Sequence, residues 1–143
     1  MIKIAKTFKF SMGHTLWKYE GNCHNFHGHN YRLEVILEGR IDSDTDMVLD
    51  YAEIKKIMEP IIDKYDHKFA ISKHDKRLAF LQQADRHAGS DSLHIMETDP
   101  TAESISGEIL AYIIMALMDL GFRDTLIPHV RLWETDDAYV ETF

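Results

Sequence analysis

The sequence predicts an α+β fold, in which a four-stranded antiparallel sheet carries two helices on one face. Three observations support this: alternating polar and apolar residues near the amino terminus, two segments of helical apolar spacing further on, and two short strand patterns at the carboxyl end. The order strand, strand, helix, helix, strand, strand is typical of helices that share one side of an antiparallel sheet. With 143 residues the chain can form one hydrophobic core, so we expect a single domain over residues 1–143.

Two strands are expected in the first forty or so residues. Polar and apolar side chains alternate over residues 2–12, which is the period of a half-buried strand. Residues 29–38 repeat the alternation, and Gly39 ends it. The apolar side chains of the two segments should share one inner face: Ile2, Ile4, Phe8, Phe10, Met12, Tyr31, Leu33, Val35 and Leu37.

The first helix is expected to begin near Asp50. Asp50 is a favourable N-cap residue, and Glu53 three positions later makes a variant of the capping box. Apolar residues then recur at helical spacing as far as Tyr65. Pro60 lies inside this pattern, so it should kink the helix or begin a second short one.

The second helix should follow Pro100 and Thr101, present a broad apolar face and close at Gly121. Residues 69–99, between the helices, mix polar residues with short apolar runs, and we expect a surface excursion with one short helix and one short strand. Two further strands are predicted at about 128–135 and 138–143, joined by a tight turn.

Composition excludes several classes of protein. The formal net charge of −8 and the lack of a basic stripe oppose nucleic-acid binding. No apolar run is long enough to cross a membrane, and the first residues do not resemble a signal peptide, so we expect a cytoplasmic protein. The single cysteine forbids an internal disulfide.

The most informative segment is residues 11–31, which hold four of the nine histidines and the only cysteine. His27 and His29 are two residues apart, so on a strand they point to the same side, together with Tyr31. His14 has the parity of Phe10 on the first strand. We therefore expect three imidazoles to meet at one end of the inner face, where zinc could bind them and keep a fourth position open.

Other interpretations of these residues stay open at this stage. Histidines can be neighbours by accident in a chain with nine of them, and His24 is more typical of an exposed or substrate-side residue than of a ligand. Cys23 could close the metal site as a fourth ligand, or stand beside the metal as a base whose pKa is lowered by nearby positive charge.

Two further acidic positions also have ordinary interpretations. The Asp66-His67 pair could merely complement a helix dipole. Glu134 shares the inward face of its strand, but it could pair with Arg131 or lie in solvent at the strand end.

The chain resembles the superfamily of 6-pyruvoyltetrahydropterin and 6-carboxytetrahydropterin synthases over most of its length. Its matching motifs follow the family order: Phe10-x-x-x-His14, Cys23-x-x-x-His27-Gly28-His29, Asp50-Tyr51, Asp66-His67, Pro100-Thr101-x-Glu103 and Glu134-Thr135. The gap between the cysteine and the histidine resembles the bacterial 6-carboxytetrahydropterin branch, which serves the queuosine pathway. The chain departs from the family pattern in Ser11-Met12-Gly13 and in a longer excursion after His67.

The resemblance implies a tunnelling fold (T-fold) and a homohexamer with active sites between subunits. It implies that zinc-dependent chemistry converts 7,8-dihydroneopterin triphosphate to 6-carboxy-5,6,7,8-tetrahydropterin, with release of acetaldehyde and triphosphate. Alternatives are 6-pyruvoyltetrahydropterin synthesis, which keeps the side-chain carbons, and a non-catalytic zinc or pterin-binding module.

The resemblance also assigns roles to individual residues. His14, His27 and His29 would bind zinc, Cys23 would be the catalytic base, and Asp66 with His67 would relay protons. Glu134 would anchor the pterin with help from Thr101 and Glu103. Lys9, Lys18 and Arg32 are candidates for triphosphate binding, although such residues more often form a solvated face.

Overall fold

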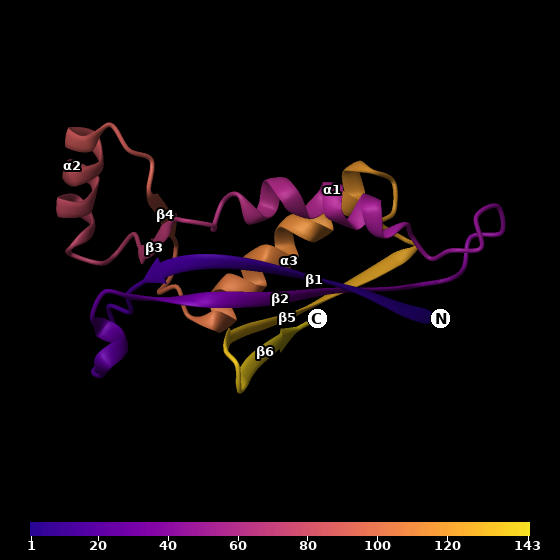
Figure 1. The fold of residues 1–143 in the computed structure, drawn as a ribbon, viewed down its shortest axis with the longest axis horizontal. Coiled ribbons are helices and arrows are strands. Elements are labelled where there is room, and N and C mark those ends of the chain that lie inside the picture. Colours follow the sequence, from indigo (N-terminus) through magenta and orange to yellow (C-terminus); the bar gives the residue numbers. More distant parts are fainter.

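The structure is a computed structural model that describes residues 1–143, and its centre is a long antiparallel hairpin (Figure 1). Strands β1 (Ile2–His14) and β2 (His27–Gly39) pair along their whole length. Strand β5 (Leu126–Thr135) pairs with the other edge of β2, and β6 (Ala138–Thr142) pairs with β5. These are the four antiparallel strands that the sequence predicts, and the α+β class is confirmed.

The sheet contains two further strands, so the predicted four-stranded antiparallel sheet is wrong in detail. Strands β3 (Phe69–Ser72) and β4 (Leu93–Met96) extend the sheet beyond β1 in parallel, which gives the order β4-β3-β1-β2-β5-β6. Both strands are four residues long. In β3, the residues from Ala70 to Ser72 are all buried, so β3 lacks the alternation that marks a half-exposed strand.

A third helix also lies within residues 69–99. Helix α2 (Leu78–Ala88) joins β3 to β4 and lies at one end of the molecule, apart from the other helices (Figure 1). It has no buried residue, because it packs on the short parallel strands rather than on the main core. The excursion therefore contains one helix and two strands, where the sequence predicts one of each.

Helix α1 (Tyr51–Ile62) begins as predicted, with the Asp50 side chain accepting a hydrogen bond from the Ala52 amide at 2.8 Å. Glu53 pairs with Lys56 on the helix surface instead of completing a capping box. Pro60 does not split the pattern into two helices, since α1 continues through it and ends at Ile62.

Helix α3 (Ala102–Asp119) is capped by Thr101, whose hydroxyl accepts from the Ser104 amide at 3.1 Å. Gly121, with φ 83°, follows the helix end as expected. None of the helices is both long and apolar enough to cross a membrane.

The core lies between the sheet and helices α1 and α3. Leu33 and Leu132 from the sheet, Met58 from α1 and Ile109 from α3 have no exposed surface. Burying such apolar side chains contributes about 1.5–3 kcal/mol each, before conformational entropy is counted. The core thus fixes the two helices over the inner face of β1 and β2, where the histidines lie.

Candidate active site

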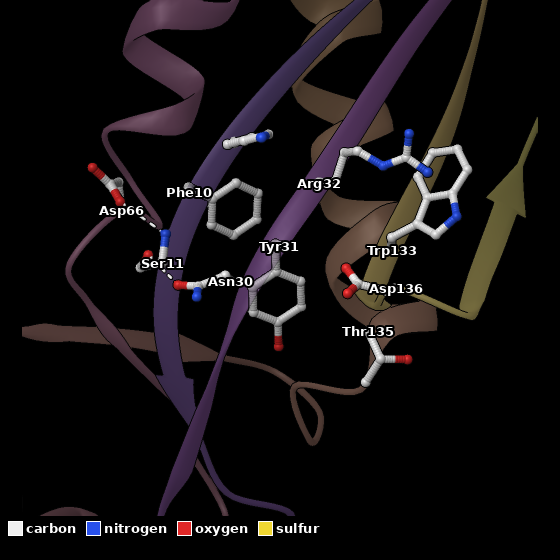
Figure 2. A pocket seen from close by; sticks show the side chains of 10 residues that line it. Phe10, Ser11, Asn30, Tyr31, Arg32, Asp66, Trp133, Thr135 and Asp136 are labelled. Atoms are coloured by element: carbon white, nitrogen blue, oxygen red, sulfur yellow. Dashed lines mark hydrogen bonds between the residues drawn. The ribbon is translucent and has the colours of Figure 1, made fainter.

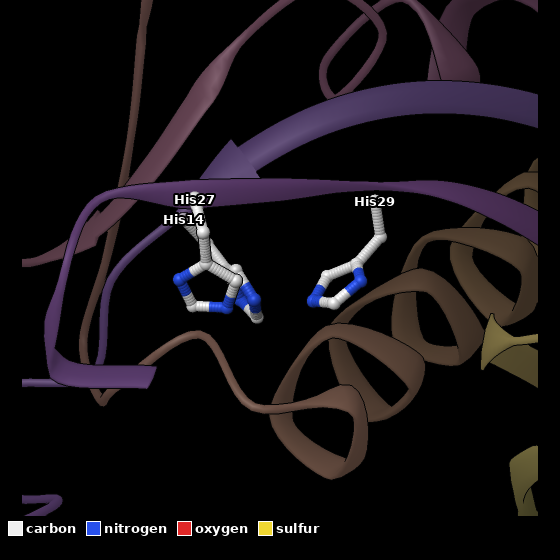
Figure 3. Close-up of side chains that lie close together, drawn as sticks. All are labelled: His14, His27 and His29. Carbon is white, nitrogen blue, oxygen red and sulfur yellow. The ribbon is translucent and has the colours of Figure 1, made fainter. Parts of the chain in front are cut away.

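Three histidines converge at the end of the β1–β2 hairpin. His14 is directly opposite His27 in the strand register, and His29 is opposite Met12. Their ligand nitrogens all lie within 4.8 Å of one another, and Figure 3 shows the three rings on the side of β2 that faces α3. The side-chain parity inferred from the sequence therefore holds in the structure for all three residues.

Backbone carbonyls orient two of these rings. His14 Nδ1 lies 2.7 Å from the Pro100 oxygen, and His27 Nδ1 lies 2.7 Å from the Asn25 oxygen. A carbonyl only accepts, so each Nδ1 carries the proton and each Nε2 keeps a free lone pair. The Nε2 atoms of all three histidines are buried and have no hydrogen-bond partner. Such orphaned nitrogens fit a divalent cation, since metal-bound imidazoles commonly donate their other N–H to a carbonyl.

The surroundings of His14 and of His29 favour the neutral form of these two imidazoles. Burial lowers the pKa of His14 and of His29 below the ordinary value of 6.5, although the nearby Glu134 carboxylate opposes this shift. His14 is 1% exposed. Neutral imidazole is the form that binds a metal, so the lowered pKa of His14 and of His29 favours metal binding.

Glu134 extends from β5 to the histidine cluster. Its Oε1 lies 3.3 Å from His14 Nε2 and 3.4 Å from His29 Nε2. The suggested ion pair with Arg131 is absent, because that arginine pairs with Glu34 and Glu141 instead. Burial and then the Glu134 charge raise the pKa of Tyr31, whose ring lies between the core and the histidines.

Cys23 lies in the loop between β1 and β2, within the short 3-10 helix η1 (Asn22–His24). The thiol is free and half-buried. It lies close enough to Tyr31 for a thiolate charge to contribute to the raised pKa of that phenol. The sulfur is not among the grouped donor atoms of the three histidines. This arrangement suits a thiol beside a metal better than a fourth ligand.

Asp66 and His67 are held at the backbone of Ser11 on β1. Asp66 Oδ1 accepts from the Ser11 amide and lies 3.0 Å from His67 Nδ1, so the two residues do pair. His67 has a left-handed φ of 60°, and its side chain is 85% exposed. Neither residue forms a hydrogen bond or ion pair with the histidine cluster or with Cys23.

A cavity of about 520 Å³ lies beside Asp66 on the opposite face of the hairpin. Figure 2 shows Asp66 at the Ser11 backbone and the Arg32 side chain beside Trp133, with the guanidinium carbon 3.8 Å from the ring centroid. Lys9 also lines this cavity. Alternation along β1 and β2 places Lys9 and Arg32 opposite the histidines, so neither can serve the same chain's histidine site directly.

The remaining predicted residues lie around the start of α3. Thr101 is the N-cap residue of α3, and its hydroxyl accepts a hydrogen bond from the Ser104 amide. Glu103 is exposed in the first turn of the same helix. Pro100, directly before them, holds His14. Lys18 is exposed, and its amide donates to Asp99.

Several groups that organise this site have no clear signal in the sequence. The Pro100 and Asn25 carbonyls have no side-chain signature, so only the folded chain could identify them. Asp75 and Arg77 belong to the poorly patterned excursion, yet Arg77 donates to the Cys23 loop. A charged pair separated by one residue was the only sequence signal for them, and such pairs are common.

Comparison with known proteins decides the family. The sequence profile of the family described as 6-pyruvoyl tetrahydropterin synthase matches residues 3–143. The chain belongs to this family. It is 31% identical to a protein of Haemophilus influenzae and 29% identical to one of Aquifex aeolicus, both named 6-carboxy-5,6,7,8-tetrahydropterin synthase. The matches cover 99% and 97% of this chain, and 98% and 96% of those proteins.

Solved structures of the family share the fold. A protein of Wolinella succinogenes superposes with a TM-score of 0.82 at 24% identity, covering 99% of this chain and 97% of that one. The 6-pyruvoyl tetrahydropterin synthase of Caenorhabditis elegans gives a TM-score of 0.71 at 24% identity, with 99% and 94% covered. At these identities the likeness supports the fold alone.

Proposed function

We propose that this pterin synthase converts 7,8-dihydroneopterin triphosphate to 6-carboxy-5,6,7,8-tetrahydropterin and releases acetaldehyde and triphosphate. The proposal depends on one observation: His14, His27 and His29 present buried nitrogens without a hydrogen-bond partner to one point, and the loop between His14 and His27 carries the free thiol of Cys23. The names of the relatives from Haemophilus influenzae and Aquifex aeolicus support this product. The pathway would be that of queuosine, and the compartment the cytoplasm.

His14, His27 and His29 would hold a zinc ion. When bound, zinc supplies Lewis acidity that lowers the pKa of oxygen groups such as the substrate's two side-chain hydroxyls. The protein's own contribution is rigidity, because the Pro100 and Asn25 carbonyls hold two of the rings in the required tautomer.

Cys23 would act as the base that removes a proton from a carbon of the substrate side chain. A thiol near a bound cation has a lowered pKa, so the thiolate is available near neutral pH. Glu134 would bind the pterin ring, whose 2-amino and N3 hydrogens match a carboxylate in a bidentate manner. The Glu134 side chain is 31% exposed, which leaves part of it accessible to a ligand. Thr101 and Glu103 would support the binding of the pterin.

Asp66 and His67 would relay protons in the active site of a neighbouring subunit. Within its own chain His67 faces solvent, whereas the bond to Asp66 holds its Nδ1 and leaves its other nitrogen outward. A homohexamer with shared sites would bring this exposed pair to a second chain's histidine cluster.

The product identifies the reaction. The zinc-loaded protein should consume 7,8-dihydroneopterin triphosphate and give acetaldehyde together with a pterin of the 6-carboxy mass. A product that keeps all side-chain carbons would instead establish 6-pyruvoyltetrahydropterin synthesis. Failure to consume the substrate would overturn both.

Substitution Cys23→Ala separates an enzyme from a non-catalytic zinc module. The variant should retain zinc and lose turnover by a factor of at least about 100, the usual contribution of a general base. Loss of zinc and of the fold in this variant would show that the thiol is a structural ligand.

A further inference from the structure

A buried ion pair lies at the turn between β3 and α2. The Asp75 carboxylate is completely buried and accepts from Arg77 at both oxygens, with Nε at 3.0 Å from Oδ1 and Nη2 at 2.7 Å from Oδ2. Burial alone would raise the pKa of Asp75, but hydrogen bonds from the Arg77 side chain and backbone outweigh it and lower the pKa. Asp75 therefore fixes the arginine in one orientation.

The same guanidinium reaches across to the loop that contains Cys23. Arg77 Nη1 donates to the His24 carbonyl at 2.7 Å, and Nη2 donates to Thr15 Oγ1 at 2.8 Å. The Thr15 hydroxyl itself donates to that His24 carbonyl at 2.7 Å. Arg77 thus joins Thr15, the residue after His14, to His24, the residue after Cys23.

Two aromatic rings also contact the guanidinium group of Arg77. Its central carbon lies 5.3 Å from the Trp17 ring centroid and 5.0 Å from the Phe26 ring centroid. Both distances are within the range of cation–π attraction. Both rings belong to the loop of residues 15–26, so the hydrogen bonds and cation–π contacts of the Arg77 side chain beyond Asp75 are all to that loop.

We propose that Arg77, held by Asp75, is a positioning residue that fixes the Cys23 loop relative to the three histidines. This inference rests on the proposed function, which makes Cys23 the base. The histidines themselves need no such help, because His14 and His27 end the paired strands and are held by other carbonyls.

The contacts of Arg77 with Asp75, Thr15 and His24, here called the Arg77 clamp, require an arginine side chain. A planar guanidinium can bind a carboxylate in a fork while a remaining N–H reaches a carbonyl, whereas the lysine ammonium is a point charge that cannot span these partners. A displacement of a reacting group by about 1 Å can reduce a rate about 100-fold. Release of the loop should therefore slow turnover without removing the metal.

The first test compares Arg77→Ala and Arg77→Lys with Arg86→Ala, a control on an exposed arginine of α2. We expect kcat to fall about 10- to 100-fold in both Arg77 variants, with KM changed less than about threefold and zinc content unchanged. Millimolar guanidinium should restore part of kcat in Arg77→Ala. An unchanged kcat, or a loss of zinc in parallel with kcat, would overturn the proposal.

The second test needs no turnover. Cys23 should be alkylated faster by iodoacetamide, and the Leu16 amide, which donates to the Cys23 carbonyl, should exchange faster in Arg77→Ala than in the wild type or in Arg86→Ala. Equal rates in all three proteins would exclude the clamp. If the wild type lacks the proposed activity but these rates differ, the proposed function fails while the clamp stands.

Discussion

At the scale of single residues, the proposed metal site depends on Gly28, which lies between His27 and His29, two of the proposed ligands. A Cβ on Gly28 would lie 2.9 Å from the Met12 carbonyl oxygen and 3.3 Å from the Gly13 Cα, both backbone atoms of the partner strand. Backbone cannot move aside as a flexible side chain can. Only glycine therefore allows β1 and β2 to approach closely at the point where His27 and His29 point to the same side.

Substitution Gly28→Ala should weaken zinc binding about 10- to 100-fold, which is the usual effect of disturbing the groups that orient metal ligands. Zinc affinity measured by competition with a chelator checks this. The matched control is Gly107→Ala within α3, where a Cβ meets nothing within 4 Å. That change should leave zinc affinity unaltered and stabilise the helix by up to about 1 kcal/mol. Equal zinc affinity in both variants would contradict the role of Gly28.

The convergence of His14, His27 and His29 could be predicted from the sequence because side-chain parity on a strand is a local property. The hydrogen-bond partners of these histidines could not be predicted from the sequence. Pro100 lies 86 residues from His14, and the Arg77 contact to His24 spans 53 residues, so both depend on how distant segments pack. The position of His67 in solvent was equally hidden, since it follows from the left-handed turn after α1.

At the scale of elements, three separate segments meet at Glu108 on α3. Its Oε1 accepts from the Tyr65 hydroxyl at 2.7 Å and lies 2.5 Å from His94 Nε2 on β4. Tyr65 is fully buried and directly precedes Asp66. Glu108 thus ties the end of α1 and the added strand β4 to the main helix.

Burial favours a higher pKa for Glu108, but the hydrogen bonds from His94 and Tyr65 outweigh it, so its pKa is lowered in the fold. A lowered carboxyl pKa stabilises the fold above the unfolded value of about 4.3, and this stabilisation is lost as pH falls through the folded pKa. The melting temperature of Glu108→Gln should therefore fall less steeply than that of the wild type below about pH 4.3. At pH 7 the variant should be less stable by about 1–3 kcal/mol.

Thermal melts between pH 3 and pH 7 check this, with Glu103→Gln as control because Glu103 is exposed on the same helix. The control should follow the wild-type curve. Parallel curves for wild type and Glu108→Gln would contradict the assigned role of the network.

Within residues 69–99 the sequence predicts one short helix and one short strand without bounds, whereas the structure has α2 and the two strands β3 and β4. Strands β3 and β4 have four residues each, which is too few to show a clear hydrophobic period, and α2 buries none of its side chains. The long strands and α3 were predictable because their apolar faces repeat over many turns or pleats. Short elements take their conformation from tertiary contacts, here the parallel pairing of Ala70 with His14.

At the scale of the whole molecule, the single chain leaves surfaces that another subunit could cover. The sheet is open at β4 and β6, and open edges attract pairing. On α3, Ile114, Met115 and Met118 are exposed apolar residues. These features, together with a His67 side chain that is 85% exposed, favour an assembly with active sites between chains.

A mixing experiment tests whether Cys23 and His67 act in different subunits. Cys23→Ala and His67→Ala should each be nearly inactive alone. If each site takes its thiol from one chain and its imidazole from another, co-refolding equal amounts should restore roughly a quarter of the wild-type sites through random assortment. As a control, Cys23→Ala is mixed with a double variant that carries both Cys23→Ala and His67→Ala. This mixture should restore no activity. If the two single variants also restore nothing, although mass measurement shows mixed oligomers, then both groups must come from one chain, and His67 would have to turn inward from its exposed position.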